Sequence, residues 1–471
     1  MTAARSKLLP AAEALVLAVI VAGQALLLRR FIPTDTFYDE GVYLVSLDAM
    51  RHGQELGTQI FTAQPPGWYH LLDAVASVFG NSIEGVRRGL VVVMCSGVVA
   101  AWGAGRALGG RGAGLLAAAL LVIAFPLPLY ASRVLSDPSS LAIVLVAVAL
   151  AALAPRRGAL VAAAASGGAF AAATSVKLYC VVALPTLALL LIRTDAARRL
   201  AAFAAGAVTV VGVFALVHLS SLGSLWNGAV SYHRVIRVQG DLDNLDAVLG
   251  VFNVRMPFTW LTVFAVVATT TALVRRRATA AALLWVWPVL VVALLLWHHP
   301  LLEHHLSLLA VALVLPVALT LVGAGPMLPR RARTVAAAAL VLVIAAGYLQ
   351  LSRRLDSEVR PEEAANVWAA QELHRVSQPG DIVVSDVPIA AYLADRRVPG
   401  ELVDTAMLRI DTGSLTPESI LHVIDTRCVT AVVAGRVFTV LPGFRDRLAE
   451  RFEQTTRHLG VSVYSRPRTP C

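Results

Sequence analysis

Charged residues are scarce in this chain of 471 residues. Only 15% of its residues are Asp, Glu, Lys or Arg, whereas 57% are hydrophobic. One soluble core could not bury that much apolar surface, so the composition excludes an ordinary soluble protein. The sequence instead predicts a protein that crosses a membrane several times.

Several motifs are also missing. The chain has no GxGxxG or P-loop sequence, so nothing supports nucleotide binding. Its net charge of +10 is not arranged as a basic stripe among aromatics, and no nucleic-acid partner is expected. Only four cysteines occur, too few over this length to define a disulfide framework. The first apolar run lacks a small-residue cleavage site, which predicts a retained anchor.

What the sequence does contain is long apolar runs. A helix needs about 18 to 20 apolar residues to cross a bilayer. Eleven spans are predicted on this basis, with one fewer left open in the region 138–192, where the breaks are slight. They cover residues 11–28, 89–105, 113–130, 138–154, 159–176, 178–192, 200–219, 257–274, 280–297, 306–323 and 335–351. The fold class expected is therefore mostly α, a polytopic transmembrane helical bundle.

Basic residues predict the orientation of this bundle, because Lys and Arg concentrate in cytoplasmic loops. They fall in every second connection, which places the N-terminus in the cytoplasm and the chain after residue 352 outside. The protein is thus expected in the cytoplasmic membrane. The basic residues concerned are Arg5, Lys7, Arg106, Arg111, Arg156, Arg157, Arg193, Arg198, Arg199, Arg275, Arg276, Arg277, Arg330, Arg331 and Arg333.

The chain changes character near residue 352. Residues 1–351 form the predicted membrane domain, and in residues 352–471 the long apolar runs stop and charge rises. Short strand-like segments at 381–385, 429–434 and 461–464 alternate with helical segments that open near Pro361 and Thr416. This alternation predicts a small α/β domain outside the cytoplasm.

Polar residues gather in the predicted outward loops. The long first loop, residues 29–88, carries the adjacent carboxylates Asp39 and Glu40 among aromatic residues. Ionisable groups at a membrane edge are costly to desolvate and mark a substrate, ion or catalytic site. The middles of the spans contain almost no charge, which favours chemistry at the outer interface over transport.

The order of four motifs resembles a known family. Asp39-Glu40, the segment Gln64–Tyr69, Ser136-Asp137-Pro138 and Lys177 resemble motifs of polyprenyl-phosphate-sugar-dependent membrane glycosyltransferases of the GT-C fold class. Aminoarabinose transferases and protein O-mannosyltransferases belong to this class, and the resemblance covers about residues 8–350 in layout. It implies transfer of a sugar from a polyprenyl-phosphate donor to a hydroxyl of a lipid, glycan or protein acceptor at the outer face, by one inverting displacement.

The resemblance also suggests roles for individual residues. Asp39 would be the general base and Glu40 would orient it or the acceptor. Asp137 would ease the positive charge that develops on the sugar, or would contact a sugar hydroxyl. Lys177 would bind the lipid phosphate as a compact charge. Further candidates for donor binding are Arg133, His233, Arg234, His304 and His305.

Plainer interpretations remain open for the same residues. Asp39 and Glu40 also fit a solvated loop pair, Asp137 before Pro138 fits a helix N-terminus, and Lys177 fits a side chain that extends to the interface. No cofactor is required. A divalent metal is left open, with His299 and Glu303 as weak ligand candidates because Pro300 separates them. Two other functions are also left open: a transporter or lipid flippase of cell-envelope precursors, and a non-catalytic assembly protein.

Overall fold

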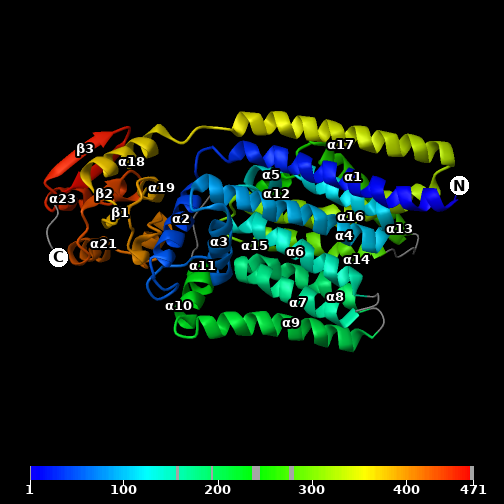
Figure 1. Cartoon of the computed structure of the whole chain (residues 1–471), viewed down its shortest axis with the longest axis horizontal. Helices are drawn as coiled ribbons and strands as arrows, with labels where there is room; N and C mark the ends of the chain where they lie inside the picture. The colour runs from blue at the N-terminus through cyan, green and yellow to red at the C-terminus, as the bar shows by residue number, and fades with distance from the viewer. Residues whose placement is uncertain (1, 155–158, 193–194, 236–243, 275–279, 467–471) are drawn as a thin grey trace. The chain divides into compact units, whose positions relative to one another are not determined.

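A computed structural model describes residues 2–154, 159–192, 195–235, 244–274 and 280–466 (Figure 1). Arg156, Arg157, Arg193 and residues 275–277, which contribute to the predicted orientation, lie outside this range. Within it, seven helical segments are long and apolar enough to cross a membrane. They comprise α1 (Thr2–Leu28), α4 (Ile83–Ile123), α6 (Ser136–Leu153), α7 (Ala159–Val176), α9 (Ala196–Val217), α16 (Ser307–Ala324) and α17 (Arg330–Glu358).

Each of the eleven predicted spans has a helical counterpart. Gly110 has a φ of 81° and breaks α4 into two helices, which correspond to the predictions at 89–105 and 113–130. Three predicted spans are shorter apolar helices, Leu178–Leu191, Pro257–Leu273 and Ala282–Trp297. They correspond to α8 (Leu184–Leu191), to α13 (Pro257–Val274), and to α14 (Ala280–Leu284) with α15 (Val286–Trp297).

The chain divides into two compact units. The first unit comprises Met1–Ile32, Arg87–Leu216 and Gly240–Val359, and holds nearly all residues of the candidate membrane helices. In this unit α6 and α16 are buried along most of their length, whereas α9 and α17 expose most of their apolar residues. An exposed apolar helix surface of this kind is typical of contact with lipid tails.

Helices α7 and α9 of the first unit approach each other very closely. A Cβ added at Gly167 would lie 1.9 Å from the carbonyl oxygen of Phe203, and one at Gly206 would lie 1.9 Å from that of Ala164. Only glycine fits at both places, as is common where helices pack in membranes without a hydrophobic driving force between them.

The second unit comprises Pro33–Val86, Val217–Gln239 and Arg360–Cys471. The predicted first loop is itself helical: α2 (Tyr38–Arg51) and α3 (Pro66–Phe79) lie within it. Helix α2 packs against α19 (Pro388–Leu393), and a Cβ at Gly41 would lie 2.9 Å from the backbone nitrogen of Ile389. The N-terminal segment and the C-terminal segment therefore form one unit.

A four-stranded sheet lies at the centre of the C-terminal segment, with strand order β1-β2-β4-β3. Strands β1 (Val383–Ser385) and β2 (Ala431–Ala434) are parallel, and β4 (Val461–Ser465) pairs antiparallel with both β2 and β3 (Gln454–His458). Helix α18 (Ala364–Val376) packs on β2 and β4. The buried carboxylate of Asp386, after β1, accepts bonds from the backbone nitrogens of Gly435, Arg436 and Phe438 and so fixes the loop after β2.

The expected fold class is confirmed, with two differences in detail. The last membrane helix continues to Glu358 and the C-terminal segment of the second unit begins at Arg360, whereas the sequence changes character near residue 352. The polar strand β3 was not predicted, because four of its five residues are exposed and it lacks an apolar face. Helix α21 (Pro417–Thr426) begins where Thr416 predicts, and the Thr416 side chain accepts from the nitrogen of Ser419 at 3.1 Å.

Candidate functional site

Asp137 is the centre of a buried polar cluster in the first unit. It lies in the first turn of α6, before Pro138, where an acidic residue is favoured by the helix dipole. Its residue is 1% exposed, and its Oδ2 lies 3.2 Å from Nζ of Lys177 and 3.7 Å from Nε2 of His304. A carboxylate buried this deeply needs paired positive charge, and Lys177 supplies it.

Lys177 lies where the helical chain is interrupted. Its backbone is extended (φ −150°, ψ 120°) between α7 and the short turn Leu178–Ala183. The residue is 6% exposed, and its ammonium lies 5.0 Å from the ring centre of Tyr179. The side chain therefore does not extend to water, which is what an interfacial side chain would do.

His304 and His305 belong to a short turn, Glu303–Leu306, that precedes α16. Their ring centres lie 4.5 Å apart, and His305 Nδ1 accepts from the backbone nitrogen of Leu302 at 3.2 Å. Glu303 points elsewhere and accepts from the Tyr130 hydroxyl at 2.7 Å. Burial and the bond to Glu303 raise the pKa of Tyr130.

The cluster offers ligand atoms for a metal or a polar substrate. One carboxylate oxygen of Asp137 and one ring nitrogen each of His304 and His305 lie within 4.8 Å of one another. Among the described residues, Asp137 Oδ1 has no hydrogen-bond partner although it is buried. A buried oxygen of this kind is costly unless something binds it. These three residues have ligand types suited to a divalent ion, and Lys177 already places one positive charge beside them.

The carboxylates Asp39 and Glu40 lie in the second unit, in the first turn of α2. Glu40 is fully buried and its Oε2 accepts from the backbone nitrogen of Phe37 at 3.1 Å, which closes the helix N-terminus. Asp39 is half-buried beside it. Two carboxylates in one turn thus have different surroundings, and Asp39 is the more accessible.

Tyr38 connects this turn to the C-terminal segment. Its hydroxyl donates to Oδ1 of Asp404 at 3.1 Å and accepts from the backbone nitrogen of Thr405 at 2.9 Å. The guanidinium of Arg436 lies 4.1 Å from its ring centre. Burial and the nearby charge of Asp404 raise the pKa of Tyr38 well above its usual value. Asp404 and Thr405 lie 366 and 367 positions from Tyr38 in the chain, so no local sequence pattern pointed to this network.

A second cation–aromatic contact lies close in this network. The guanidinium of Arg409 is 3.8 Å from the ring centre of Phe61, and it donates to the backbone oxygens of Glu401 and Asp404. Phe61 in turn packs edge to face against Tyr232. Burial lowers the pKa of Arg409. Neither Phe61 nor Tyr232 stands in a motif, so sequence reasoning gave them no role.

The remaining predicted residues are placed as follows. Arg133 is buried, with its guanidinium 5.6 Å from the ring centre of Phe31. His299 is exposed and lies outside the Asp137 cluster, as does Glu303. In the second unit, His233 donates from Nε2 to the backbone oxygen of Ala63 at 2.8 Å and Arg234 is exposed.

The structure thus brings together four of the predicted residues, Asp137, Lys177, His304 and His305. Asp39, Glu40, His233 and Arg234 belong to the second unit, and Lys177 belongs to the first. That Asp39 and Lys177 share one cavity therefore stays a prediction. Asp137, His304 and His305 are the clustered residues that could hold an ion. They differ from His299 and Glu303, the weak metal-ligand candidates of the sequence analysis.

Comparison with known proteins identifies the fold. No family model and no curated protein matches the sequence. Solved structures match over nearly the whole chain, and they define it as a polytopic membrane protein of the GT-C fold class.

Two of these structures come from different organisms. ArnT from Cupriavidus metallidurans, bound to undecaprenyl phosphate, is 15% identical with a TM-score of 0.68, covering 96% of this chain and 97% of its own. The oligosaccharyltransferase from Archaeoglobus fulgidus in the apo form is 12% identical with a TM-score of 0.57, covering 90% of this chain and 69% of its own. A structure of the archaeal protein with zinc and sulfate has a TM-score of 0.54, at 12% identity, 92% of this chain and 69% of its own.

Proposed function

We propose that the protein is a membrane glycosyltransferase. It transfers a sugar from a polyprenyl-phosphate donor to an acceptor hydroxyl at the outer face of the cytoplasmic membrane. The observation that carries the proposal is the buried cluster of Asp137, Lys177 and His304 within a GT-C fold. Support for a lipid-phosphate donor comes from the structural neighbour ArnT, which was solved with undecaprenyl phosphate.

Lys177 is assigned to the donor phosphate. It lies at the end of a membrane helix, where the phosphate of a membrane-anchored lipid would also lie. A lysine is a compact point charge and suits a phosphate oxygen. Asp137 holds the ammonium in place through the 3.2 Å pair, and its Oδ1 is available to accept from a sugar hydroxyl.

Asp39 is assigned to the acceptor. The acceptor oxygen attacks the anomeric carbon, its proton passes to the Asp39 carboxylate, and a new C–O bond forms. The bond from that carbon to the phosphate oxygen breaks, and the electron pair leaves with the lipid phosphate. A positioned base contributes about 10²- to 10⁴-fold to such a step. Glu40 keeps the helix turn closed around Asp39 through its bond to Phe37.

A divalent ion is a second occupant that the cluster could accept. Asp137, His304 and His305 would hold it, and it would supply positive charge for the donor phosphate. The archaeal neighbour solved with zinc supports keeping this option. Lys177 argues for the metal-free form, because its ammonium already faces the carboxylate that the ion would need.

The test is reconstitution of the purified protein with a panel of polyprenyl-phosphate sugars. Asp39→Asn should lower donor consumption about 10²- to 10⁴-fold with unchanged melting temperature. Asp425→Asn is the matched control, because Asp425 pairs with Arg451 at an exposed site of the same unit.

Two results would contradict the proposal. Turnover by Asp39→Asn equal to that of the parent protein would remove the base assignment. Movement of intact donor across the vesicle membrane, with no new glycosidic bond detected by mass spectrometry, would identify a transporter or flippase instead.

A further inference from the structure

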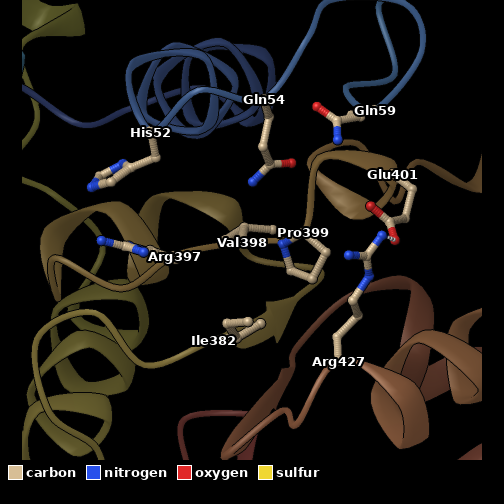
Figure 2. Close-up of a pocket in the computed structure, with 9 residues that line it drawn as sticks. All are labelled: His52, Gln54, Gln59, Ile382, Arg397, Val398, Pro399, Glu401 and Arg427. Carbon is tan, nitrogen blue, oxygen red and sulfur yellow. Dashed lines mark ion pairs between the residues drawn. The ribbon is translucent and has the colours of Figure 1, made fainter.

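A small cavity of about 180 Å³ lies in the second unit, beyond the C-terminal end of α2. One wall comes from the connection between α2 and α3, and the other from the C-terminal segment. Figure 2 shows Gln54 and Gln59 reaching toward Pro399 and Glu401 across this cavity. The volume is below the roughly 300 to 1,000 Å³ of pockets for drug-sized ligands, so it suits a ligand of one small ring.

The two walls are joined by backbone contacts at Gly400. Its nitrogen donates to Oε1 of Gln54 at 2.9 Å, and its oxygen accepts from the nitrogen of Phe61 at 3.0 Å. A Cβ at Gly400 would lie 2.5 Å from Oε1 of Gln54, so only glycine permits this approach. With its oxygen held, Gln54 directs its amide nitrogen into the cavity, toward the side of Arg397 (Figure 2).

The far wall is part of the sheet. The backbone of Arg397 donates to Asp381 at 3.1 Å and accepts from Val383 at 2.8 Å, which extends the edge of β1. Glu401 and Arg427 form an ion pair of 3.2 Å at the opposite side. Between these polar groups the lining is apolar, formed by Ile382, Val398 and Pro399 (Figure 2).

The charges around the cavity are close to balanced. Glu401 neutralises Arg427, and Asp48, which lies 3.3 Å from His52, also faces the charge of Arg397. A phosphate or sulfate would find no excess of positive charge. Amide and guanidinium donors, a carboxylate acceptor and an apolar floor instead match the hydroxyls and the C–H face of a neutral sugar ring.

We propose that this cavity binds one neutral sugar residue of a glycan. This proposal rests on the proposed function in one respect, because it takes the glycan to be the acceptor. The 14 residues of α2 span about 20 Å at 1.5 Å per residue, with Asp39 in the first turn and His52 just past the last. The bound sugar is therefore a remote unit of an extended acceptor and not the unit that reacts.

The test uses the full chain in nanodiscs, without donor, on an array of neutral and anionic oligosaccharides, with affinities then measured by saturation-transfer NMR. Gln59→Trp fills the cavity and Arg427→Ala removes one half of its ion pair. Both should weaken binding of neutral oligosaccharides at least tenfold. Arg447→Ala, which breaks the 2.8 Å pair with Glu418 in the same segment, should bind like the parent protein.

Asp39→Asn separates this inference from the proposed function. Loss of transfer with retained glycan binding supports both proposals. Transfer activity without any neutral glycan bound on the array overturns the cavity's assignment alone. Binding that persists in both cavity variants, or a preference for glucuronate or inorganic phosphate over neutral oligosaccharides, also overturns it.

Discussion

The Tyr38 hydroxyl and the Asp404 carboxylate are joined by a hydrogen bond of 3.1 Å, although 366 positions separate them in the chain. Tyr38 directly precedes Asp39 in the first turn of α2, and Thr405 donates to the same hydroxyl. The C-terminal segment thereby fixes the turn that carries the proposed base. The C-terminal segment contains no nucleotide-binding motif, and holding this turn of α2 in place gives it a structural role.

Tyr38→Phe should lower kcat about tenfold and leave the KM for donor unchanged. The substitution leaves the ring against Arg436 but removes the bonds to Asp404 and Thr405, so Asp39 is held less firmly. Stability should fall by about 1 to 3 kcal/mol, because Thr405 loses an acceptor. Steady-state kinetics and thermal melting measure both effects.

The control for this variant is Tyr392→Phe. Tyr392, on α19, donates to the backbone oxygen of Asn81 in the same unit, and it lines a pocket with Asp48 and Arg51 near the C-terminal end of α2, away from Asp39. It should lose stability without losing kcat. Equal kcat values for the two variants would show that Tyr38 has only a structural role.

Lys177 is one of only two lysines in the sequence, with Lys7 the other. Lys177→Met alone would leave the buried Asp137 charge unpaired, at a cost of about 3 to 5 kcal/mol. The double variant Asp137→Asn with Lys177→Met removes both charges and should fold. We expect its affinity for undecaprenyl phosphate to fall about 10- to 100-fold, as loss of a charge-assisted bond implies.

Arg30→Met is the matched variant for this measurement. Arg30 pairs with Asp356 at 2.8 Å in the same unit, at a more exposed position. Its lipid-phosphate affinity should equal that of the parent protein. An unchanged affinity of the double variant for undecaprenyl phosphate would show that Lys177 has only a structural role beside Asp137.

Metal removal should leave turnover intact. Lys177 already supplies a positive charge 3.2 Å from Asp137, so the proposed donor phosphate would have a cationic partner without an ion. Turnover after EDTA treatment and desalting is the measurement, and added zinc should inhibit by binding Asp137, His304 and His305. If turnover is lost on chelation and restored by a divalent ion, the metal binds the donor phosphate and Lys177 does not suffice.

The contact between His70 and His218 leads us to expect that low pH destabilises the second unit. His70 and His218 lie with their Nε2 atoms 2.8 Å apart, so both cannot be protonated without repulsion. Burial lowers the pKa of both, and Asp73 beside His70 and Glu55 beside His218 oppose the shift only in part. The unfolded chain, with histidine pKa values near 6.5, binds more protons. Stability is therefore present above about pH 6.5 and lost as the pH falls through the lower pKa values of the folded state.

Thermal melting at pH 7.5 and pH 5.5 measures this effect. His70→Gln should reduce the difference between the two pH values, whereas His422→Gln, at an exposed position on α21, should leave it unchanged. A parent protein equally stable at both pH values would contradict the prediction.

The membrane helices were predictable because a bilayer imposes a length and an apolar composition on each of them. Even the break at Gly110 coincides with the predicted gap between 105 and 113. The Asp137 cluster was predictable only as a set of polar residues at helix ends. Its pairings depend on the turn at Lys177 and the turn Glu303–Leu306, whose geometry no periodic pattern encodes.

The partners of Tyr38 could not be predicted. Asp404 and Thr405 are far from Tyr38 in sequence, and their contact arises from the packing of α2 on α19 at Gly41. The strand β3 was missed for a different reason. Residues Gln454–His458 are polar on both faces, and their strand conformation comes from pairing with β4.

The glycines of α7 and α9 have a consequence for how the proposed lipid donor would reach Lys177. With Gly167 against Phe203 and Gly206 against Ala164, the backbones touch and leave no gap for an isoprenoid tail between these two helices. The polyprenyl chain of the proposed donor would therefore approach Lys177 along another side of the bundle.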